Sequence, residues 1–181
     1  QEPPSRAARR VELKDARAGN ASVRRFYLAP SLPKAEPGEA EALYLLMKIV
    51  GHSSTSRLYQ KLVVEEKLAS SAGGWYSGLG LDSGSIGVYA VAAKDVGLDK
   101  VEAGIDRVLH ELRENPVSAD ELERAKKAFI ADFIYESDSQ SALARRYGEG
   151  LVLGLTIKQI NDWPVAIAKV TAEDIRRVAG Q

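Results

Sequence analysis

Several features that would point directly to a function are missing from this 181-residue sequence. It has no cysteine, which excludes disulfides, thiolate zinc sites and cysteine nucleophiles. No apolar run approaches the roughly 18 residues that a membrane span needs. The 25 basic and 25 acidic residues balance, so no net charge attracts nucleic acid or an anionic membrane. With 45% hydrophobic residues, the chain is expected to be an ordinary globular domain.

Histidine is also scarce, and its placement argues against a metal site. His52 and His110 are the only two, and neither lies in an H-E-x-x-H or H-x-x-E-H frame. A catalytic zinc site usually needs three protein ligands. We predict His110 on a helix surface and His52 at a helix C-terminus, and we expect neither a metal ligand nor a catalytic residue in this chain.

Residue patterning divides the chain into a linker at 1–10 and a single domain at 11–181. Strands are predicted at 11–17, 22–28, 69–77 and 83–93. Helices are predicted at about 43–50, 58–67 and 98–114, from the capping box Ser118–Glu121 to Phe133, from a weaker box at Ser137 and Gln140 to Leu151, over 156–168 with an interruption at Trp163-Pro164, and from Thr171 to about Ala179.

This order of elements predicts an α+β fold, an antiparallel-rich sheet with helices packed on one face. The serine and glycine content of 69–77 predicts the close approach of another backbone to that strand. The pattern leaves room for a final strand of the sheet beyond Gln181.

Two groups of residues have a functional interpretation and a simpler structural one. The run Ser53–Ser56 could suggest a nucleophile or a phosphate loop, but it lacks the motifs of either, and we predict helix capping. Trp75 and Tyr76 could line a peptide groove, although packing in the core or at the sheet edge is favoured.

An ordered set of segments resembles the C-terminal domain of the pitrilysin/insulinase family of zinc peptidases, which includes mitochondrial processing peptidase. The segments are Leu28–Ser31, Leu43–Gly51, Ser54–Leu62 with Glu65, Leu68-Ala69, Ser118–Leu122 with Lys126-Lys127, and Val170–Val178. Together they cover nearly the whole chain from about Val11.

The resemblance implies half of a clamshell-shaped, metallohydrolase-like peptidase. In this family the N-terminal half carries H-x-x-E-H and a distant Glu, which hold zinc and activate water. The C-terminal half closes over the peptide substrate and helps to bind it. The chain is therefore expected to pair with the zinc-bearing N-terminal domain of its parent, to hold no zinc and to be inactive alone. The resemblance implies the periplasm or cell envelope for a bacterial protein and the mitochondrial matrix for a eukaryotic one, and the residues leave both compartments open.

The chain departs from the family pattern at the positions that assist catalysis. The family often has an Arg, with a Tyr seven positions later, that position substrate and stabilise the oxyanion; these positions are Val63 and Ser70 here. A family glycine is replaced by Lys67. The resemblance then implies a second homologous subunit that supplies Arg and Tyr.

Two other interpretations stay open from the sequence. The chain could be a catalytically silent structural or partner subunit of the same fold. It could also be a free-standing module that receives a peptide along strands 69–93.

Overall fold

The computed structural model describes residues 7–17 and 19–180. The strands are β1 (Ser22–Pro30), β2 (Ala69–Ser77) and β3 (Ser83–Ala92). The helices are α1 (Glu39–Gly51), α2 (Arg57–Tyr59) with its π-helical continuation η1 (Gln60–Glu65), α3 (Leu98–Glu114), α4 (Ala119–Ser137), α5 (Gln140–Val152), α6 (Ile157–Lys169) and α7 (Ala172–Ala179).

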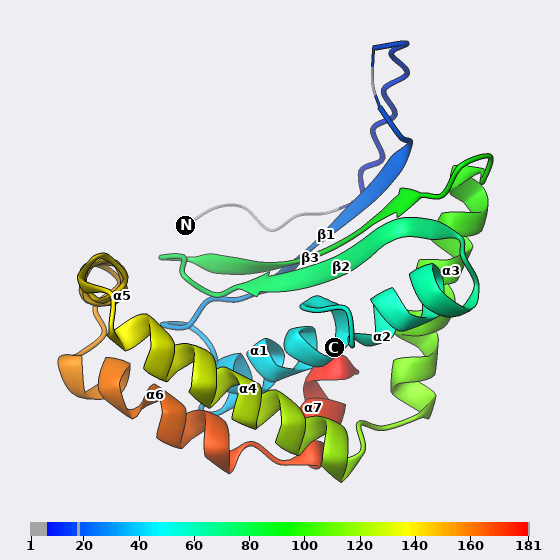
Figure 1. The fold of residues 1–181 in the computed structure, drawn as a ribbon. Coiled ribbons are helices and arrows are strands. Elements are labelled where there is room, and N and C mark those ends of the chain that lie inside the picture. The colour runs from blue at the N-terminus through cyan, green and yellow to red at the C-terminus, as the bar shows by residue number, and fades with distance from the viewer. Residues whose placement is uncertain (1–6, 18, 181) are drawn as a thin grey trace.

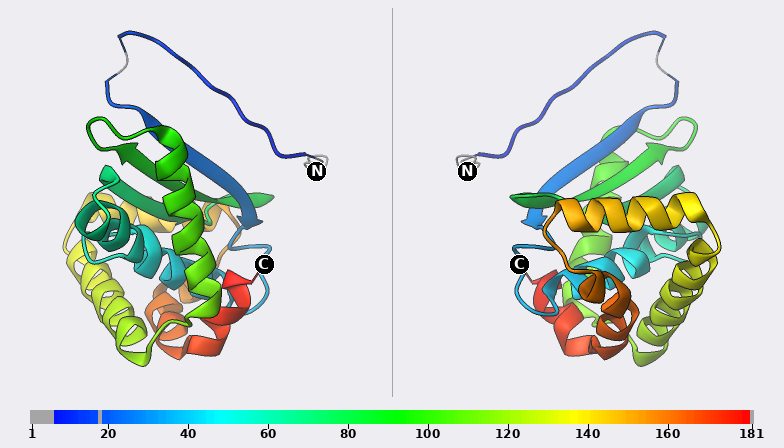
Figure 2. Two further views of the ribbon diagram at one scale, coloured as in Figure 1. Left: turned by 90° about the vertical axis from the view of Figure 1, so that its right-hand side faces the viewer. Right: turned by 90° about the vertical axis from the view of Figure 1, so that its left-hand side faces the viewer.

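Within the described residues the strands form one antiparallel sheet in the order β1-β3-β2. The helices lie on one side of it, as Figure 1 and the two views of Figure 2 show. On that side Val23, Ala90 and Ala72 lie in register across the three strands and are buried. The predicted α+β class, with helices on one face of an antiparallel sheet, is confirmed.

The helix α1 approaches β2 so closely that their backbones touch. A Cβ on Gly51 would lie 2.1 Å from the backbone nitrogen of Gly74, and one on Gly74 would lie 2.6 Å from the terminal methyl of Met47. An approach this close requires glycine at the contact. The composition of 69–77 therefore reflects the close approach that the sequence predicts.

The predicted strand at 11–17 is wrong. The segment has no regular secondary structure over 11–15, and Val11 and Leu13 are 91% and 88% exposed. Alternation specifies a strand only where one of its faces is buried, and this segment leaves the sheet instead (Figure 2). Residues 1–6 of the predicted linker lie outside the described residues, and 8–10 have no regular structure.

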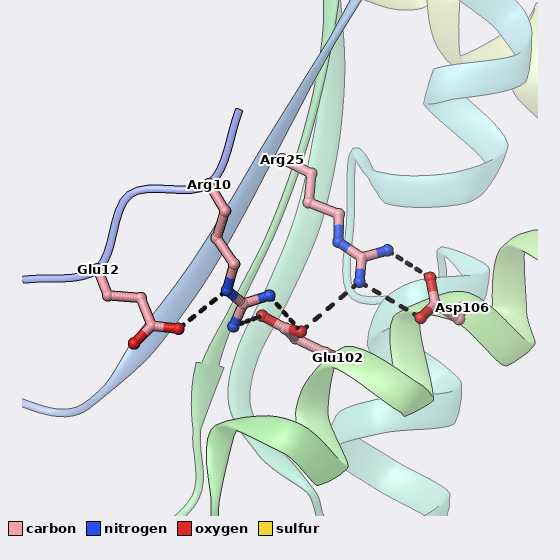
Figure 3. Close-up of polar contacts among 5 residues, drawn as sticks. All are labelled: Arg10, Glu12, Arg25, Glu102 and Asp106. Atoms are coloured by element: carbon pink, nitrogen blue, oxygen red, sulfur yellow. Dashed lines mark hydrogen bonds and ion pairs between the residues drawn. The ribbon is translucent and has the colours of Figure 1, made fainter. Parts of the chain in front are cut away.

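Charged side chains attach the N-terminal segment to α3 (Figure 3). Arg10 makes two nitrogen–oxygen contacts of 2.9 Å with the Glu102 carboxylate. Arg25 of β1 pairs with Asp106, one turn further along α3, and lies 4.0 Å from Glu102. One face of α3 thus binds both the first strand and the segment that precedes it.

The capping box of Ser118 and Glu121 is confirmed at the start of α4, but the weaker box is wrong. The helix α4 continues to Ser137, whose hydroxyl donates to the Phe133 carbonyl at 2.7 Å. The N-cap of α5 is Ser139, which accepts from the Ala142 N–H at 3.3 Å. A serine in the last turn of a helix can bond back to the preceding turn, and this competes with capping the next helix.

The predicted interruption at Trp163-Pro164 is also wrong, because α6 runs through Pro164. Proline removes one backbone hydrogen bond from the helix. Ile160 and Ile167, on either side of it, are 6% and 0% exposed. We infer that their burial against the domain outweighs the lost bond.

Candidate functional site

The positions that the family pattern assigns to Arg and Tyr lie on η1 and at the start of β2. Val63 is partly buried and packs against the core. Ser70 is exposed and occupies an irregularity in the pairing of β2 with β3. Its hydroxyl donates to the carbonyl oxygens of Val91 and Ala92 at 3.4 and 3.5 Å. The Val63 side chain has no donor and the Ser70 hydroxyl is directed to its own sheet. The loss of the family's Arg and Tyr assistance at these positions stays a prediction, and the substrate-binding residues of the chain stay unassigned.

The two histidines lie on different elements. The His110 side chain is 69% exposed on α3, 3.1 Å from Glu114, as expected for a surface histidine. His52 is exposed at the C-cap of α1. Among residues 7–17 and 19–180 no group of three or more His, Asp or Glu side chains could hold a metal ion. The donor set present in the described chain therefore does not fit a catalytic zinc ion.

The serine-rich run between α1 and α2 forms a turn. The Ser53 hydroxyl accepts from the Thr55 N–H at 3.3 Å and lies 2.9 Å from the Thr55 hydroxyl. Ser56 occupies the N-cap position of α2, but its side chain does not cap the helix. Its Oγ is buried with no hydrogen-bond partner among the described residues. The prediction of an N-cap in this run is thus confirmed for the position of Ser56, but the predicted hydrogen bond between its side chain and the helix is absent.

The aromatic pair at the end of β2 points to opposite sides of the sheet. Trp75 covers Gly87 of β3, where a Cβ would lie 2.4 Å from the indole, and it meets Phe26 edge-on at 5.9 Å between ring centroids. The Tyr76 hydroxyl donates to the Pro30 carbonyl at 2.6 Å. Most contacts of both side chains are therefore with the sheet, as the favoured interpretation predicts. Both residues also border the cavity described next.

A cavity of about 880 Å³ lies at the end of β2 in the described part of the chain. Its walls are the segment 32–38, the first turns of α1, the second half of α4, and α5 with α6. In Figure 1 α5 stands beyond the end of the sheet, away from α3. The volume is within the usual range of ligand sites, roughly 300–1,000 Å³.

Half of the chain's aromatic residues line this cavity. They are Tyr44, Trp75, Tyr76, Phe129, Phe133 and Trp163. Tyr44 packs edge-on against Phe129 at 5.2 Å between ring centroids. The Arg146 guanidinium lies 3.7 Å above the centre of the Phe133 ring, a cation–π contact.

Burial and nearby carboxylates raise the pKa of two phenols in this wall. Burial first, and then the charges of Glu39 and Glu41, raise the pKa of Tyr76 to about 12. Burial, Asp132 and Glu136 raise the pKa of Tyr44 in the same way. These two aromatic side chains are therefore uncharged at neutral pH, and the neighbouring carboxylates make the electrostatic potential around them negative.

Sequence reasoning missed this cavity. Tyr44, Phe133 and Trp163 belong to three separate helices, and in each helix an aromatic residue fits an ordinary apolar stripe. The one available signal is Trp75-Tyr76, for which a groove is the less favoured interpretation.

Comparison with known families identifies the chain. Residues 1–129 match the family described as the peptidase M16 inactive domain. The chain belongs to this family. The predicted resemblance to the C-terminal domain of pitrilysin-type zinc peptidases is thereby confirmed.

Relatives of the M16 inactive domain include enzymes named as proteases. An uncharacterized zinc protease of Streptomyces coelicolor is 29% identical over 174 residues, which cover 96% of this chain and 37% of the relative. A protease from Helicobacter pylori has the same fold, with a TM-score of 0.80 and 24% identity over 88% of this chain and 37% of that one. Pitrilysin aligns with a TM-score of 0.68 and 14% identity over 89% of this chain and 17% of its own.

The chain thus spans little more than a third of the Streptomyces and Helicobacter relatives. Along its described part, no helix combines the length and the apolar character needed to cross a bilayer.

Proposed function

We propose that this M16 inactive domain is the C-terminal half of a zinc metalloendopeptidase and that it closes over the peptide substrate. The zinc ion belongs to the N-terminal half of the parent, which would supply the ligands and the general base. The observation that carries this proposal is the combined match, to the inactive-domain family and to about a third of a relative named a zinc protease. The unsuitable donor set of the described chain agrees with it.

In this proposal the chain contributes binding surface rather than chemistry. An outer strand such as β2 can accept an extended peptide through main-chain hydrogen bonds. Enclosing the peptide also excludes water, which strengthens the electrostatic interactions at the distant zinc site. Both roles change the rate of hydrolysis without any catalytic group in this chain.

The experiment compares the chain alone, the N-terminal half of its parent alone, and the two together. We expect no stoichiometric zinc and no hydrolysis of a quenched fluorogenic peptide by the chain alone. We expect chelator-sensitive hydrolysis by the pair that exceeds the rate of the N-terminal half alone. Zinc is measured by atomic absorption on the same samples.

Two results would contradict the proposal. Chelator-sensitive hydrolysis by the purified chain would show that it carries its own site. A parent without H-x-x-E-H in its N-terminal half would instead identify a silent structural subunit, the alternative that shares this fold.

The residues Val63 and Ser70 lead to a second part of the proposal, a homologous subunit that supplies Arg and Tyr. The Ser70 side chain is too short to place its hydroxyl where a tyrosine hydroxyl would lie. The side chain of Val63 has no hydrogen-bond donor. If the intact parent hydrolyses peptide fully as a purified single chain, this partner is unnecessary. If it needs a second chain for activity, the partner is supported.

A further inference from the structure

The cavity at the end of β2 has more carboxylates than cations around it. Five acidic side chains line it, Glu36, Glu41, Glu136, Glu149 and Asp162. Three basic side chains line it, Arg145, Arg146 and Lys158. At neutral pH the lining therefore has two more negative than positive charges.

The ion pairs within the lining leave this imbalance uncompensated. Arg146 pairs with Glu136 at 3.1 Å, and Lys158 pairs with Asp162 in the next turn of α6. The other four charged groups, Glu36, Glu41, Glu149 and Arg145, have no side-chain hydrogen bond or ion pair within the described chain. The lining thus holds three unpaired carboxylates and one unpaired cation.

The aromatic wall has the same electrostatic preference. Ring faces carry the negative end of the aromatic quadrupole and attract cations, most strongly where water is excluded. The cavity already contains one such contact, between Arg146 and the ring of Phe133. The rings of Tyr44, Trp163 and Tyr76 have no comparable cation in the described structure.

We propose that this cavity binds an arginine or lysine side chain carried by an otherwise apolar peptide segment. The charged head would lie near Glu41, and the aromatic rings would cover its aliphatic stem and the neighbouring apolar residues. The choice of a peptide as the source of this cation rests on the proposed function. Charge complementarity favours a cation over an anion, because the single unpaired Arg145 is opposed by three unpaired carboxylates.

The position of the cavity suits such a ligand. It begins where β2 ends, at Ser77 and Gly78. A peptide added along the outer edge of β2 would continue into it. Its volume of about 880 Å³ has room for several side chains rather than one.

The chain provides its own reporter for the test. Of its two tryptophans, Trp163 lines the cavity from α6, so a ligand in the cavity should change the intrinsic fluorescence. Trp75 also borders the cavity, but its indole covers Gly87 and is expected to respond less. The probe is the blocked peptide acetyl-Leu-Arg-Leu-Arg-Leu-amide, titrated into the 181-residue chain at low ionic strength. Two further probes replace each arginine by citrulline, which keeps the shape without the charge, or by glutamate.

We expect saturable binding of the arginine peptide and roughly tenfold weaker binding of the citrulline peptide. Glu41→Gln and, separately, Glu149→Gln should each weaken binding of the arginine peptide roughly threefold. Glu114→Gln, which removes the same charge on α3 outside the cavity lining, should leave binding unchanged. Far-ultraviolet circular dichroism verifies that each variant is folded.

Each contrary result overturns the proposal. Equal affinity for the arginine and citrulline peptides would show an apolar cavity without charge preference. Tighter binding of the glutamate peptide would assign the site to Arg145 and an anion, and no binding by any probe would show that the cavity does not take peptides. Because the titration needs neither zinc nor the N-terminal half, its failure is distinct from a failure of the proposed peptidase role.

Discussion

The two ends of the sheet are packed very differently. At one end α2, η1 and α3 enclose side chains that are completely buried, among them Leu58, Leu62, Val101 and Ile105 at 0% exposure. At the other end the only buried residue of α5 is Gly150, and a cavity of about 880 Å³ separates α5 from β2. The same layer of helices is thus close-packed at one end and open at the other.

This difference suggests that the two ends of the sheet have different roles, one in stability and the other in ligand binding. Close-packed interiors contribute most of the apolar burial that stabilises a domain. An element with little burial contributes less and opens at a lower free energy, which is where binding elements are usually found. We therefore expect substitutions at the α3 end to change stability and substitutions beside α5 to change binding.

The largest expected effect comes from adding one methyl group at the contact of α1 with β2. Gly51→Ala would place Cβ within 2.1 Å of the Gly74 backbone, and forcing the two elements apart should lower the free energy of unfolding by about 2–3 kcal/mol. Gly148→Ala in α5 is the matched control, because a Cβ there meets nothing within 4 Å. It should raise the free energy of unfolding by up to about 1 kcal/mol through helix propensity.

Urea titrations of the two glycine variants, followed by circular dichroism, measure this contrast. Equal destabilisation by both substitutions would contradict the distinction between the packed and the open end.

An intermediate effect is expected from pH, through the ion pair that joins α2 to α4. Arg57 donates to both oxygens of the Glu121 carboxylate at 3.0 and 2.9 Å, and this lowers the carboxyl pKa to about 2. A lowered pKa stabilises the fold above the unfolded value of about 4.3, and the contribution is lost as pH falls toward 2. Glu121→Gln should cost about 1–2 kcal/mol at neutral pH and progressively less in acid.

The measurement is the urea midpoint of wild type and variant between neutral pH and about pH 3. Glu173→Gln, which removes an exposed pair with Arg176, should change stability by less than about 0.5 kcal/mol at every pH. A difference between Glu121→Gln and wild type that does not shrink in acid would contradict the assignment.

The smallest expected effect is a stabilisation at Lys67, where the family pattern has glycine. Lys67 adopts a φ of +53°, a conformation that costs a residue with a Cβ but not glycine. Lys67→Gly should therefore raise the free energy of unfolding by about 0.5–1 kcal/mol. Asp95→Gly, at a φ of +63°, should raise it less, because aspartate tolerates this region.

Thermal unfolding of the Lys67 and Asp95 variants provides the measurement. A loss of stability in Lys67→Gly would show that the lysine side chain makes a compensating contact.

Local patterns predicted most elements because their causes are local. The spacing of Leu43, Leu46, Met47 and Val50 matches one helix face wherever that helix packs, and α1 contains all four. The run at 11–17 failed for the opposite reason. Its alternation meets the local requirement for a strand, but no neighbour in the described structure buries Val11 or Leu13.

Sites made from distant segments are beyond such reasoning. Ser118 and Glu121 are three residues apart and form their capping box within one turn, so the sequence predicted it. Tyr44, Phe133 and Trp163 meet only after three helices have packed. No spacing along the chain encodes that meeting, and the cavity was therefore not predicted.

The sequence by itself determined the α+β class, the family resemblance and the absence of cysteine ligands. Periodicity, motif order and composition can all be determined along the chain without knowing how it packs. The tertiary structure decided that α6 runs through Pro164, that the segment at 11–17 leaves the sheet, and that unpaired carboxylates gather beside aromatic rings at the end of β2. Each of these depends on which surfaces become buried together, and burial is a property of the packed chain.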